Sequence, residues 1–210
     1  MIPIRAKPDM PTALLLCASI QHCVPAITRR VEVPATISLL DLHIVLQILF
    51  DWQDCHLWQF SFGKVDYVGD DVDDVDDFAP ASRESRGAYG VLLMDALEKR
   101  RTFLYNYDFG DDWQVDLKFE RKIESTEAGV PVCTEGAHAG PVEDCGGPFG
   151  YMNLLEILAN PNHPEREETL EWLDEDFDPA AFDLTAVNAE LRDVFSPKPK
   201  RHRPKQPKPQ

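Results

Sequence analysis

The sequence predicts an α+β domain with a mixed or antiparallel sheet, a central β-hairpin and a helical C-terminal part. Several segments alternate apolar and polar residues with the period of two that half-buried strands show. Another segment is apolar on nearly every side, as expected of a buried helix. The predicted strands are residues 12–20, 26–33, 57–62, 65–68 and a short one around 130–133. The predicted helices are residues 39–50, 91–97, 152–158, 164–173 and 184–194.

The first predicted helix has a recognisable start and two polar positions. Ser38 and Asp41 have the spacing of a capping box, which satisfies free N–H groups at a helix N-terminus. His43 and Gln47 are four residues apart and share one face. His43 is interpreted as a core histidine bonded to a backbone carbonyl, with a metal ligand or proton carrier as the alternative. The order strand, strand, helix, strand, strand is compatible with a β-grasp-like sheet crossed by one helix.

The central hairpin is the most distinctive stretch. Apolar side chains alternate from Phe103 to Phe109 and again from Trp113 to Phe119, so two strands flank the segment between them. Gly110 is expected to supply the positive φ that a tight reversal needs. Asp111 and Asp112 can hydrogen-bond the backbone of the turn.

Length and cysteine content indicate one intracellular domain. The 210 residues are divided into a flexible N-terminus (1–11), a single domain (12–196) and a disordered basic Pro/Lys tail (197–210). The five cysteines are odd in number and form no CxxC pair, which favours free thiols in the cytoplasm. No run approaches the roughly 18 to 20 apolar residues of a membrane span, so no membrane contact is expected.

The charge is unevenly distributed. The chain carries −16, while residues 197–210 contain six basic residues and no acidic one, so the rest carries −22. A domain this acidic repels phosphate backbones, so the expected partner is a protein with a basic surface. Nucleic acid would be contacted only through the tail. Arg29 and Arg30 form the one basic pair of the first strands, interpreted as a solvated or salt-bridged strand face or, alternatively, an anion site.

Other motifs carry weaker signals. The acidic segment 69–77 lacks the ligand spacing, central glycine and terminal glutamate of an EF-hand, which favours a solvated loop. The glycines of residues 146–150 precede a helix but have no lysine for a phosphate. Cys133, His138 and Cys145 lack the paired spacing of structural zinc sites. The acids before Cys145 also argue against it as a nucleophile.

The candidate site combines the hairpin turn with the glycine-rich loop. If the two segments meet, their carboxylates converge beside aromatic side chains and could bind a divalent metal or act as acid and base. His43, His56 or His163 could complete such a site, whereas the alternative is that the aspartates only brace turns. The candidate residues are Tyr107, Asp108, Asp111, Asp112, Trp113, Glu143, Asp144, Gly146 and Gly147, and the metal candidates are Asp111, Asp112, Glu143, Asp144 and His43.

Short motifs along most of the chain occur in the same order as in a known protein family. They are Pro25 with Arg29-Arg30, Asp41-Leu42-His43, Trp52, His56-Leu57 with Phe60, Tyr105 to Trp113, Pro141, Glu143 to Gly147, Gly150-Tyr151, Phe177-Asp178, Phe182-Asp183 and Asn188. Together they resemble the plasmid pRiA4b Orf-three-like domain family, bacterial and archaeal proteins that include passenger proteins of some insertion elements, called resolvase-like. The chain departs from the family pattern at Thr28, Asp51 and Val142, where tryptophan, glycine and proline are usual.

The resemblance implies a fold but assigns no reaction, so two functions stay open. The first is a non-enzymatic accessory or interaction protein of the kind carried by plasmids and insertion elements, with an acidic face for a basic partner. The second is a metal-dependent hydrolase or nuclease that uses the acidic loops at 108–112 and 143–144.

Overall fold

A computed structural model describes residues 12–69, 82–125, 127, 129–173 and 177–197. The expected flexible N-terminus, nearly all of the acidic segment 69–77 and the basic tail after Pro197 lie outside the described residues. Among the described residues, no helix is long and apolar enough to cross a membrane.

The core of the fold is one eight-stranded sheet with the order β5-β4-β3-β6-β7-β1-β2-β8. All neighbours are antiparallel except β4 and β5, which are parallel. The predicted α+β class and mixed sheet are therefore confirmed. The strands are β1 (Thr12–Ile20), β2 (Thr28–Pro34), β3 (Trp58–Phe62), β4 (Val65–Val68), β5 (Glu84–Gly87), β6 (Thr102–Tyr107), β7 (Trp113–Glu124) and β8 (Val132–Ala137).

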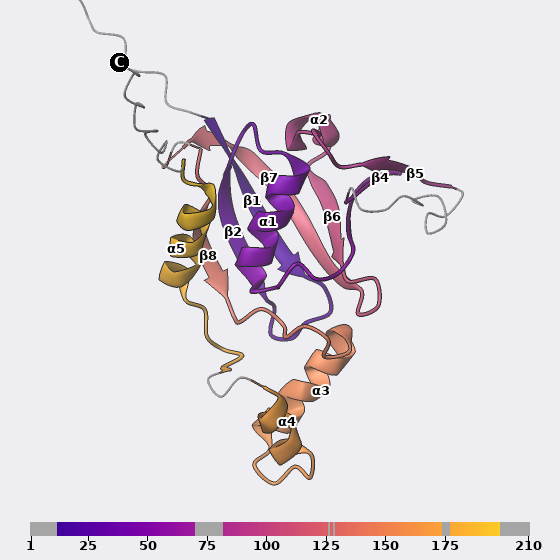
Figure 1. Ribbon diagram of the computed structural model, residues 1–210, viewed down its shortest axis with the longest axis vertical. Helices are drawn as coiled ribbons and strands as arrows, with labels where there is room; N and C mark the ends of the chain where they lie inside the picture. The colour runs from indigo at the N-terminus through magenta and orange to yellow at the C-terminus, as the bar shows by residue number, and fades with distance from the viewer. Residues whose placement is uncertain (1–11, 70–81, 126, 128, 174–176, 198–210) are drawn as a thin grey trace, which may run out of the picture.

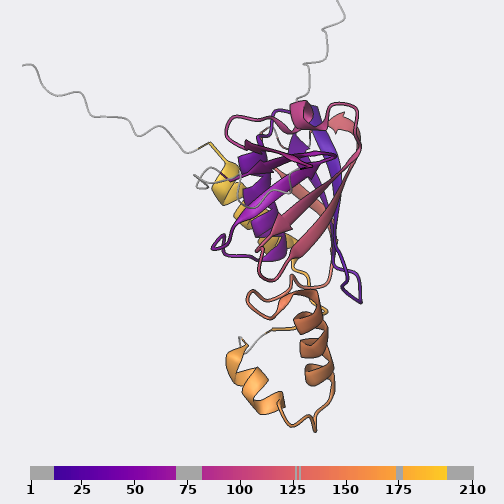
Figure 2. The same ribbon diagram turned by 90° about the vertical axis from the view of Figure 1, so that its right-hand side faces the viewer.

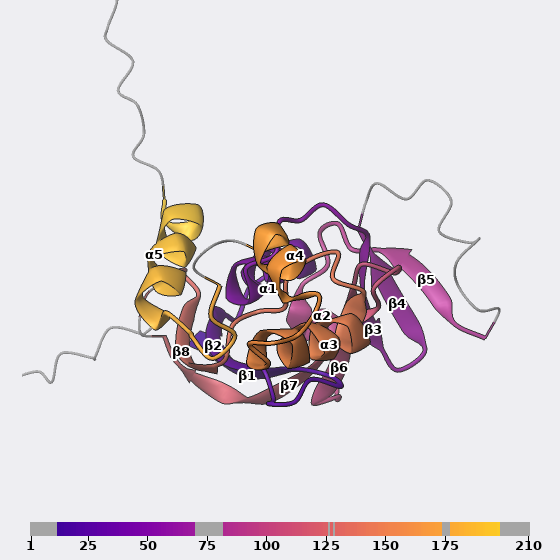
Figure 3. The ribbon, with the colours of Figure 1, turned by 90° about the horizontal axis from the view of Figure 1, so that it is seen from below.

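Five helices complete the described part of the chain. α1 lies across one face of the sheet, as expected, and α5 packs on the same side against β8 (Figures 1 and 3). α3 and α4 project together from one end of the sheet (Figure 2). The helices are α1 (Leu39–Phe50), α2 (Leu93–Leu97), α3 (Gly147–Ala159), α4 (Arg166–Trp172) and α5 (Leu184–Phe195).

Local sequence signals set both ends of α1 and the start of α5. Ser38 Oγ accepts a 3.0 Å hydrogen bond from the Asp41 backbone N, so the predicted cap is present. The Asp41 carboxylate accepts from the Ser38 hydroxyl. α1 ends at Phe50, and its C-cap Asp51 is left-handed with φ 59°. Asp183 caps α5, because its Oδ1 accepts from the backbone N of Thr185 and Ala186.

Several element boundaries differ from the prediction. β5 was not predicted, because its sequence, Glu-Ser-Arg-Gly, has no apolar alternation. β8 begins and ends later than the predicted strand around 130–133. α3 starts at Gly147, several residues early, since glycine and proline can occupy a first helical turn. α4 starts at Arg166 after the N-cap Glu165, so Pro164 precedes the helix instead of beginning it.

The predicted hairpin forms, but its turn uses different residues. Tyr107 is paired with Trp113, and the side chain of Phe109 lies beyond β6 and is exposed. Asp108 (φ 56°) and Asp112 (φ 55°) have the left-handed conformations, so the prediction for Gly110 was wrong. The reason is local hydrogen bonding: Asp108 Oδ1 accepts from the backbone N of Gly110 at 2.9 Å, and short polar side chains stabilise this conformation.

The two arginines of β2 point to opposite faces of the sheet. Arg30 bonds Glu120 and Glu135, which is the predicted salt-bridged strand face. Arg29 is only 3% exposed, and its guanidinium lies 4.0 Å from the centre of the Phe182 ring. It donates to the carbonyl oxygens of Leu49, Thr28 and Ala137. Arg29 therefore joins α1 to the end of β8 and binds no carboxylate in the described part of the chain.

Candidate functional site

Three loops meet at the end of the sheet next to α3. They are the post-helix loop (51–57), the hairpin turn (108–112) and the glycine loop (141–147). Asp108 N donates to Leu57 O at 2.9 Å, and Trp52 Nε1 donates to Pro141 O at 3.1 Å. Gly146 N donates to Asp111 Oδ2 at 3.2 Å. The hairpin turn and the glycine loop thus lie together, and the post-helix loop joins them in this three-loop junction.

Gly147 allows a close approach between two of these loops. It has φ 66°, and a Cβ atom there would lie 2.2 Å from the backbone oxygen of Asp111. A side chain at this position would therefore push the hairpin turn and the glycine loop apart. Gly146 is also left-handed, with φ 87°, and serves as the N-cap of α3.

Tyr107 organises the buried side of the junction. Its ring is fully buried, and its hydroxyl donates to Glu143 Oε1 at 2.5 Å while accepting from Cys55 N at 3.1 Å. Glu143 Oε1 also accepts from Gln53 N at 3.1 Å. Because Oε1 has these two donors, the Glu143 carboxylate is fixed with Oε2 facing Cys55 Sγ at 3.6 Å.

His56 faces the same space from the post-helix loop. Its Nε2 is 3.4 Å from Asp144 Oδ1 and 3.7 Å from Asp108 Oδ2. This nitrogen is buried and has no hydrogen-bond partner among the described residues. A buried nitrogen without a partner is costly, and it lies here between two carboxylates.

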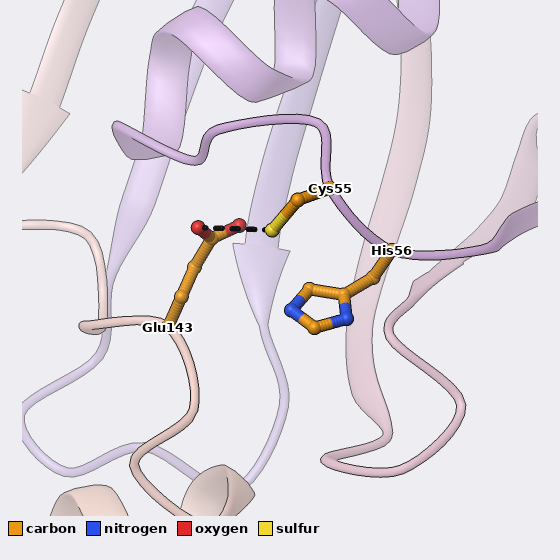
Figure 4. Close-up of side chains that lie close together, drawn as sticks. All are labelled: Cys55, His56 and Glu143. Atoms are coloured by element: carbon orange, nitrogen blue, oxygen red, sulfur yellow. Dashed lines mark hydrogen bonds between the residues drawn. The ribbon is translucent and has the colours of Figure 1, made fainter.

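Two groups of side chains in the junction have the spacing of metal ligands. One contains Cys55, His56 and Glu143, and the other contains His56, Asp108 and Asp144; within each, the donor atoms lie within 4.8 Å of one another. Figure 4 shows Cys55, His56 and Glu143 pointing toward a common space.

Asp111 and Asp112 belong to neither group. Asp111 bonds the glycine loop, and the two oxygens of Asp112 accept from Asn106 and Gln114. Trp113 is fully buried in the core. These three side chains therefore hold the hairpin in place.

His43 also lies outside both groups. It is buried and stacks on Trp58 with ring centres 4.2 Å apart. Its ring nitrogens contact the Tyr105 hydroxyl and Asp54 Oδ1, each at 2.7 Å. The interpretation as a core histidine holds, but the predicted backbone carbonyl was wrong, because the side chains of Tyr105 and Asp54 reach the ring instead.

A pocket of about 570 Å³ opens beside the junction. None of its described lining residues is a lysine or an arginine, so its polar side is acidic and it suits neutral or cationic groups better than phosphate. Its described lining residues are Leu40, Asp41, His43, Ile44, Asp54, Cys55, His56, Leu57, Trp58 and Gly69.

The surroundings raise the pKa of the junction's proton donors. Burial raises the pKa of Tyr107 well above its usual value, and the hydrogen bond to Glu143 raises it further. Loss of solvent around the Cys55 thiol raises its pKa, and the charges of Glu143 and Asp144 add to this effect. Both groups are therefore protonated at neutral pH when no cation is bound.

Sequence reasoning named His56 only as one of three histidines and did not select Cys55. Their adjacency in a polar loop directly after the helix was the available signal. The weaker zinc set of Cys133, His138 and Cys145 forms no group with metal-ligand spacing among the described residues, and neither does His163.

The fold and the junction together define an α+β protein with an acidic, solvent-open loop cluster at one end of its sheet. A family model described as plasmid pRiA4b ORF-3-like protein matches residues 12–186. The chain belongs to this family of plasmid pRiA4b ORF-3-like proteins, as the sequence resemblance implied.

Two relatives agree with this membership. The uncharacterized protein y4hQ of Sinorhizobium fredii (strain NBRC 101917 / NGR234) is 36% identical over 182 residues, covering 85% of this chain and 90% of the relative. The crystal structure of MM3350, a protein of unknown function from Methanosarcina mazei Go1, matches with a TM-score of 0.72 and 33% identity. That match covers 83% of this chain and 97% of MM3350. Neither relative has an assigned activity.

Proposed function

We propose that this chain is a non-enzymatic accessory protein of the cytoplasm that binds a protein with a basic surface through its acidic end. The observation that supports this most is α4, none of whose described side chains is buried. Leu170 and Trp172 on this helix are 46% and 51% exposed. Exposed apolar patches mark interaction sites, and tryptophan is one of the residues enriched among those that contribute most to binding.

The charge of the projecting part of the chain indicates that its partner is basic. Residues 141–173, which include the glycine loop and both projecting helices, contain seven acidic residues and one arginine. A surface of one sign attracts the opposite sign and repels like charge. A basic protein patch with an apolar centre fits Trp172 and its acidic surroundings. The net charge of −22 outside the basic tail disfavours nucleic acid as the partner of the body. Such a role suits proteins carried by plasmids and insertion elements.

The test is affinity capture from a lysate of the source organism, followed by binding measurements with the purified partner. Trp172→Ala and the combined Glu167→Gln and Glu171→Gln variant should each weaken binding about ten-fold or more, as expected for an interface anchor. The matched control neutralises the exposed carboxylates of α5 with Glu190→Gln and Asp193→Asn, and should bind normally. Equal weakening by the control would mean that overall charge attracts the partner without a specific surface.

A metal-dependent hydrolase or nuclease is the second candidate. The observation favouring it is the pocket of about 570 Å³ beside the ligand-like groups of the three-loop junction. A metal ion at the edge of a pocket can activate water or polarise a bound carbonyl. Because the pocket has an acidic lining, an amide or ester substrate fits it better than a nucleic acid.

A hydrolysis screen with amide, ester and phosphoester substrates, with Zn²⁺, Mn²⁺ or Mg²⁺ added, tests this second candidate. Activity that is lost in Glu143→Gln and kept in Glu190→Gln would support it. Absence of turnover with every metal and substrate class would leave the binding function as the better supported of the two.

A further inference from the structure

We propose that Cys55, His56 and Glu143 bind one transition-metal ion of the Zn²⁺ type, with Asp144 next to the fourth coordination position. This site does not depend on whether the chain is an enzyme. The three residues come from two loops that are far apart in sequence. Their donor atoms lie within 4.8 Å of one another. They supply one sulfur, one nitrogen and one oxygen ligand.

The spacing of the donors agrees with tetrahedral zinc coordination. Zinc–sulfur and zinc–oxygen bonds of about 2.3 and 2.1 Å place the two ligand atoms about 3.6 Å apart in a tetrahedron. Cys55 Sγ and Glu143 Oε2 are 3.6 Å apart. A nitrogen and an oxygen ligand would be about 3.4 Å apart by the same geometry. His56 Nε2 and Asp144 Oδ1 are 3.4 Å apart.

The ligands are held in position by groups around them. The Tyr107 hydroxyl bonds both Glu143 Oε1 and the Cys55 backbone N, so it fixes one ligand side chain and the backbone of another. Gln53 N provides a second bond to Glu143 Oε1. Oε2 is therefore the oxygen that faces the thiol and would bind the ion. Partners of this kind orient metal ligands and raise affinity.

The donor types select the class of metal. Mg²⁺ and Ca²⁺ take oxygen ligands, whereas thiolate and imidazole favour Zn²⁺ and related ions. The neighbouring carboxylates of Asp108 and Asp144 add negative charge that further attracts a divalent cation. Binding requires the thiol of Cys55 to lose its proton to solvent, so each ion bound would release about one proton at neutral pH.

The fourth coordination position of the proposed metal ion is accessible to solvent, because two of the residues around it are exposed. Cys55 is exposed, and the Asp144 side chain is 73% exposed. Structural zinc sites are usually closed by four protein ligands, whereas sites with three fixed ligands keep a position for water or another molecule. Asp144 can occupy that position or leave it to a ligand in the adjacent pocket.

Cobalt titration of the full-length, chelator-treated protein tests the proposal. We expect one Co²⁺ per chain with a thiolate-to-cobalt absorption band, displaced by Zn²⁺ but not by Mg²⁺ or Ca²⁺. Cys55→Ser should abolish the band, and Cys55→Ser, His56→Asn and Glu143→Gln should each weaken Zn²⁺ binding at least about ten-fold. The matched control is Cys17→Ser, because Cys17 bonds Glu120 on the sheet and belongs to neither ligand group.

A second measurement keeps the test decisive if a variant unfolds. X-ray absorption of the Zn²⁺-loaded wild-type protein should show one sulfur ligand among nitrogen and oxygen ligands. A cobalt band that persists in Cys55→Ser, or a zinc spectrum without sulfur, would overturn the proposal. Failure of the wild-type protein to bind Zn²⁺ more tightly than Mg²⁺ would overturn it as well.

Discussion

The hydroxyl of Tyr107 donates a 2.5 Å hydrogen bond to Glu143 across 36 positions of sequence. The same oxygen accepts from the backbone N of Cys55. One buried tyrosine at the end of β6 thus connects the glycine loop to the post-helix loop. Since the aromatic side of the hairpin is core, the position of the candidate metal ligands is coupled to the packing of the sheet.

Replacing Tyr107 with phenylalanine should therefore affect both stability and the junction. The ring still fills its space, but Glu143 loses a donor and the Cys55 N–H loses its acceptor, which costs about 1–3 kcal/mol of unfolding free energy. Zn²⁺ affinity should fall about 10- to 100-fold, as when other partners of metal ligands are removed. Urea unfolding and competition titration measure the two effects.

Tyr67→Phe is the matched control, because a long 3.5 Å contact with Arg86 is the one hydrogen bond of the Tyr67 hydroxyl within the described part of the chain. It should leave Zn²⁺ affinity unchanged. If Tyr107→Phe also left that affinity unchanged, the hydroxyl would have no part in positioning the ligands.

Gly147→Ala should separate the hairpin turn from the glycine loop. A left-handed φ alone costs a residue with a Cβ about 1–2 kcal/mol. At Gly147 the added Cβ would also lie 2.2 Å from the Asp111 backbone oxygen, which cannot move without shifting the turn. Gly90 has φ 71° and open space around it, so Gly90→Ala isolates the cost of φ. Urea unfolding should show a clearly larger loss for Gly147→Ala, whereas equal losses would mean that the loops adjust freely.

The sequence was sufficient for elements whose pattern is local. Ser38 and Asp41 identified the start of α1, and the alternation from Phe103 to Tyr107 identified β6, because caps and strand faces depend on neighbouring residues. The period of two also places Arg29 on the same side of β2 as the buried Val31. The charge of Arg29, however, favoured the prediction of an exposed side chain.

Local sequence patterns could not predict which side chains form the three-loop junction. Cys55 and Glu143 are separated by 88 positions, and only the order of strands in the sheet brings their loops together. The carboxylates most conspicuous in the sequence, Asp111 and Asp112, bond backbone and amide groups instead. The density of carboxylates predicted that the candidate site lies at the hairpin turn and the glycine loop. Which carboxylates are available as metal ligands depends on which of them already bond groups of the hairpin and its neighbours.

Arg29→Met should be strongly destabilising. The guanidinium donates to the carbonyl oxygens of Leu49, Thr28 and Ala137 at 2.7 to 2.9 Å in a buried position. Methionine fills part of the volume but leaves these acceptors unsatisfied, which should cost roughly 2–4 kcal/mol. Arg30→Met on the opposite face is the control and should change stability little, since its ion pairs are partly exposed. Thermal and urea unfolding of both variants compare them, and similar losses would contradict a special role for Arg29.

Buried His43 should make stability depend on pH in the weakly acidic range. Burial lowers the pKa of His43, and this effect outweighs the hydrogen bond and charge of Asp54, which raise it. In the unfolded chain the imidazole titrates near its ordinary pKa of about 6.5. Between the folded-state pKa and about 6.5, the unfolded chain binds more protons, so unfolding free energy increases with pH in that window.

The contribution of His43 is fully present above about pH 6.5 and is lost as the pH falls toward its folded-state pKa. His43→Gln lacks the ionisation, so its unfolding free energy should fall less than that of the wild type between about pH 7 and about pH 5. His22→Gln, which changes an exposed turn residue, should keep the wild-type slope because His43 remains. Urea titrations at several pH values give the slopes. A His43→Gln slope equal to that of the wild type would mean that His43 does not enter the folded core as a neutral imidazole.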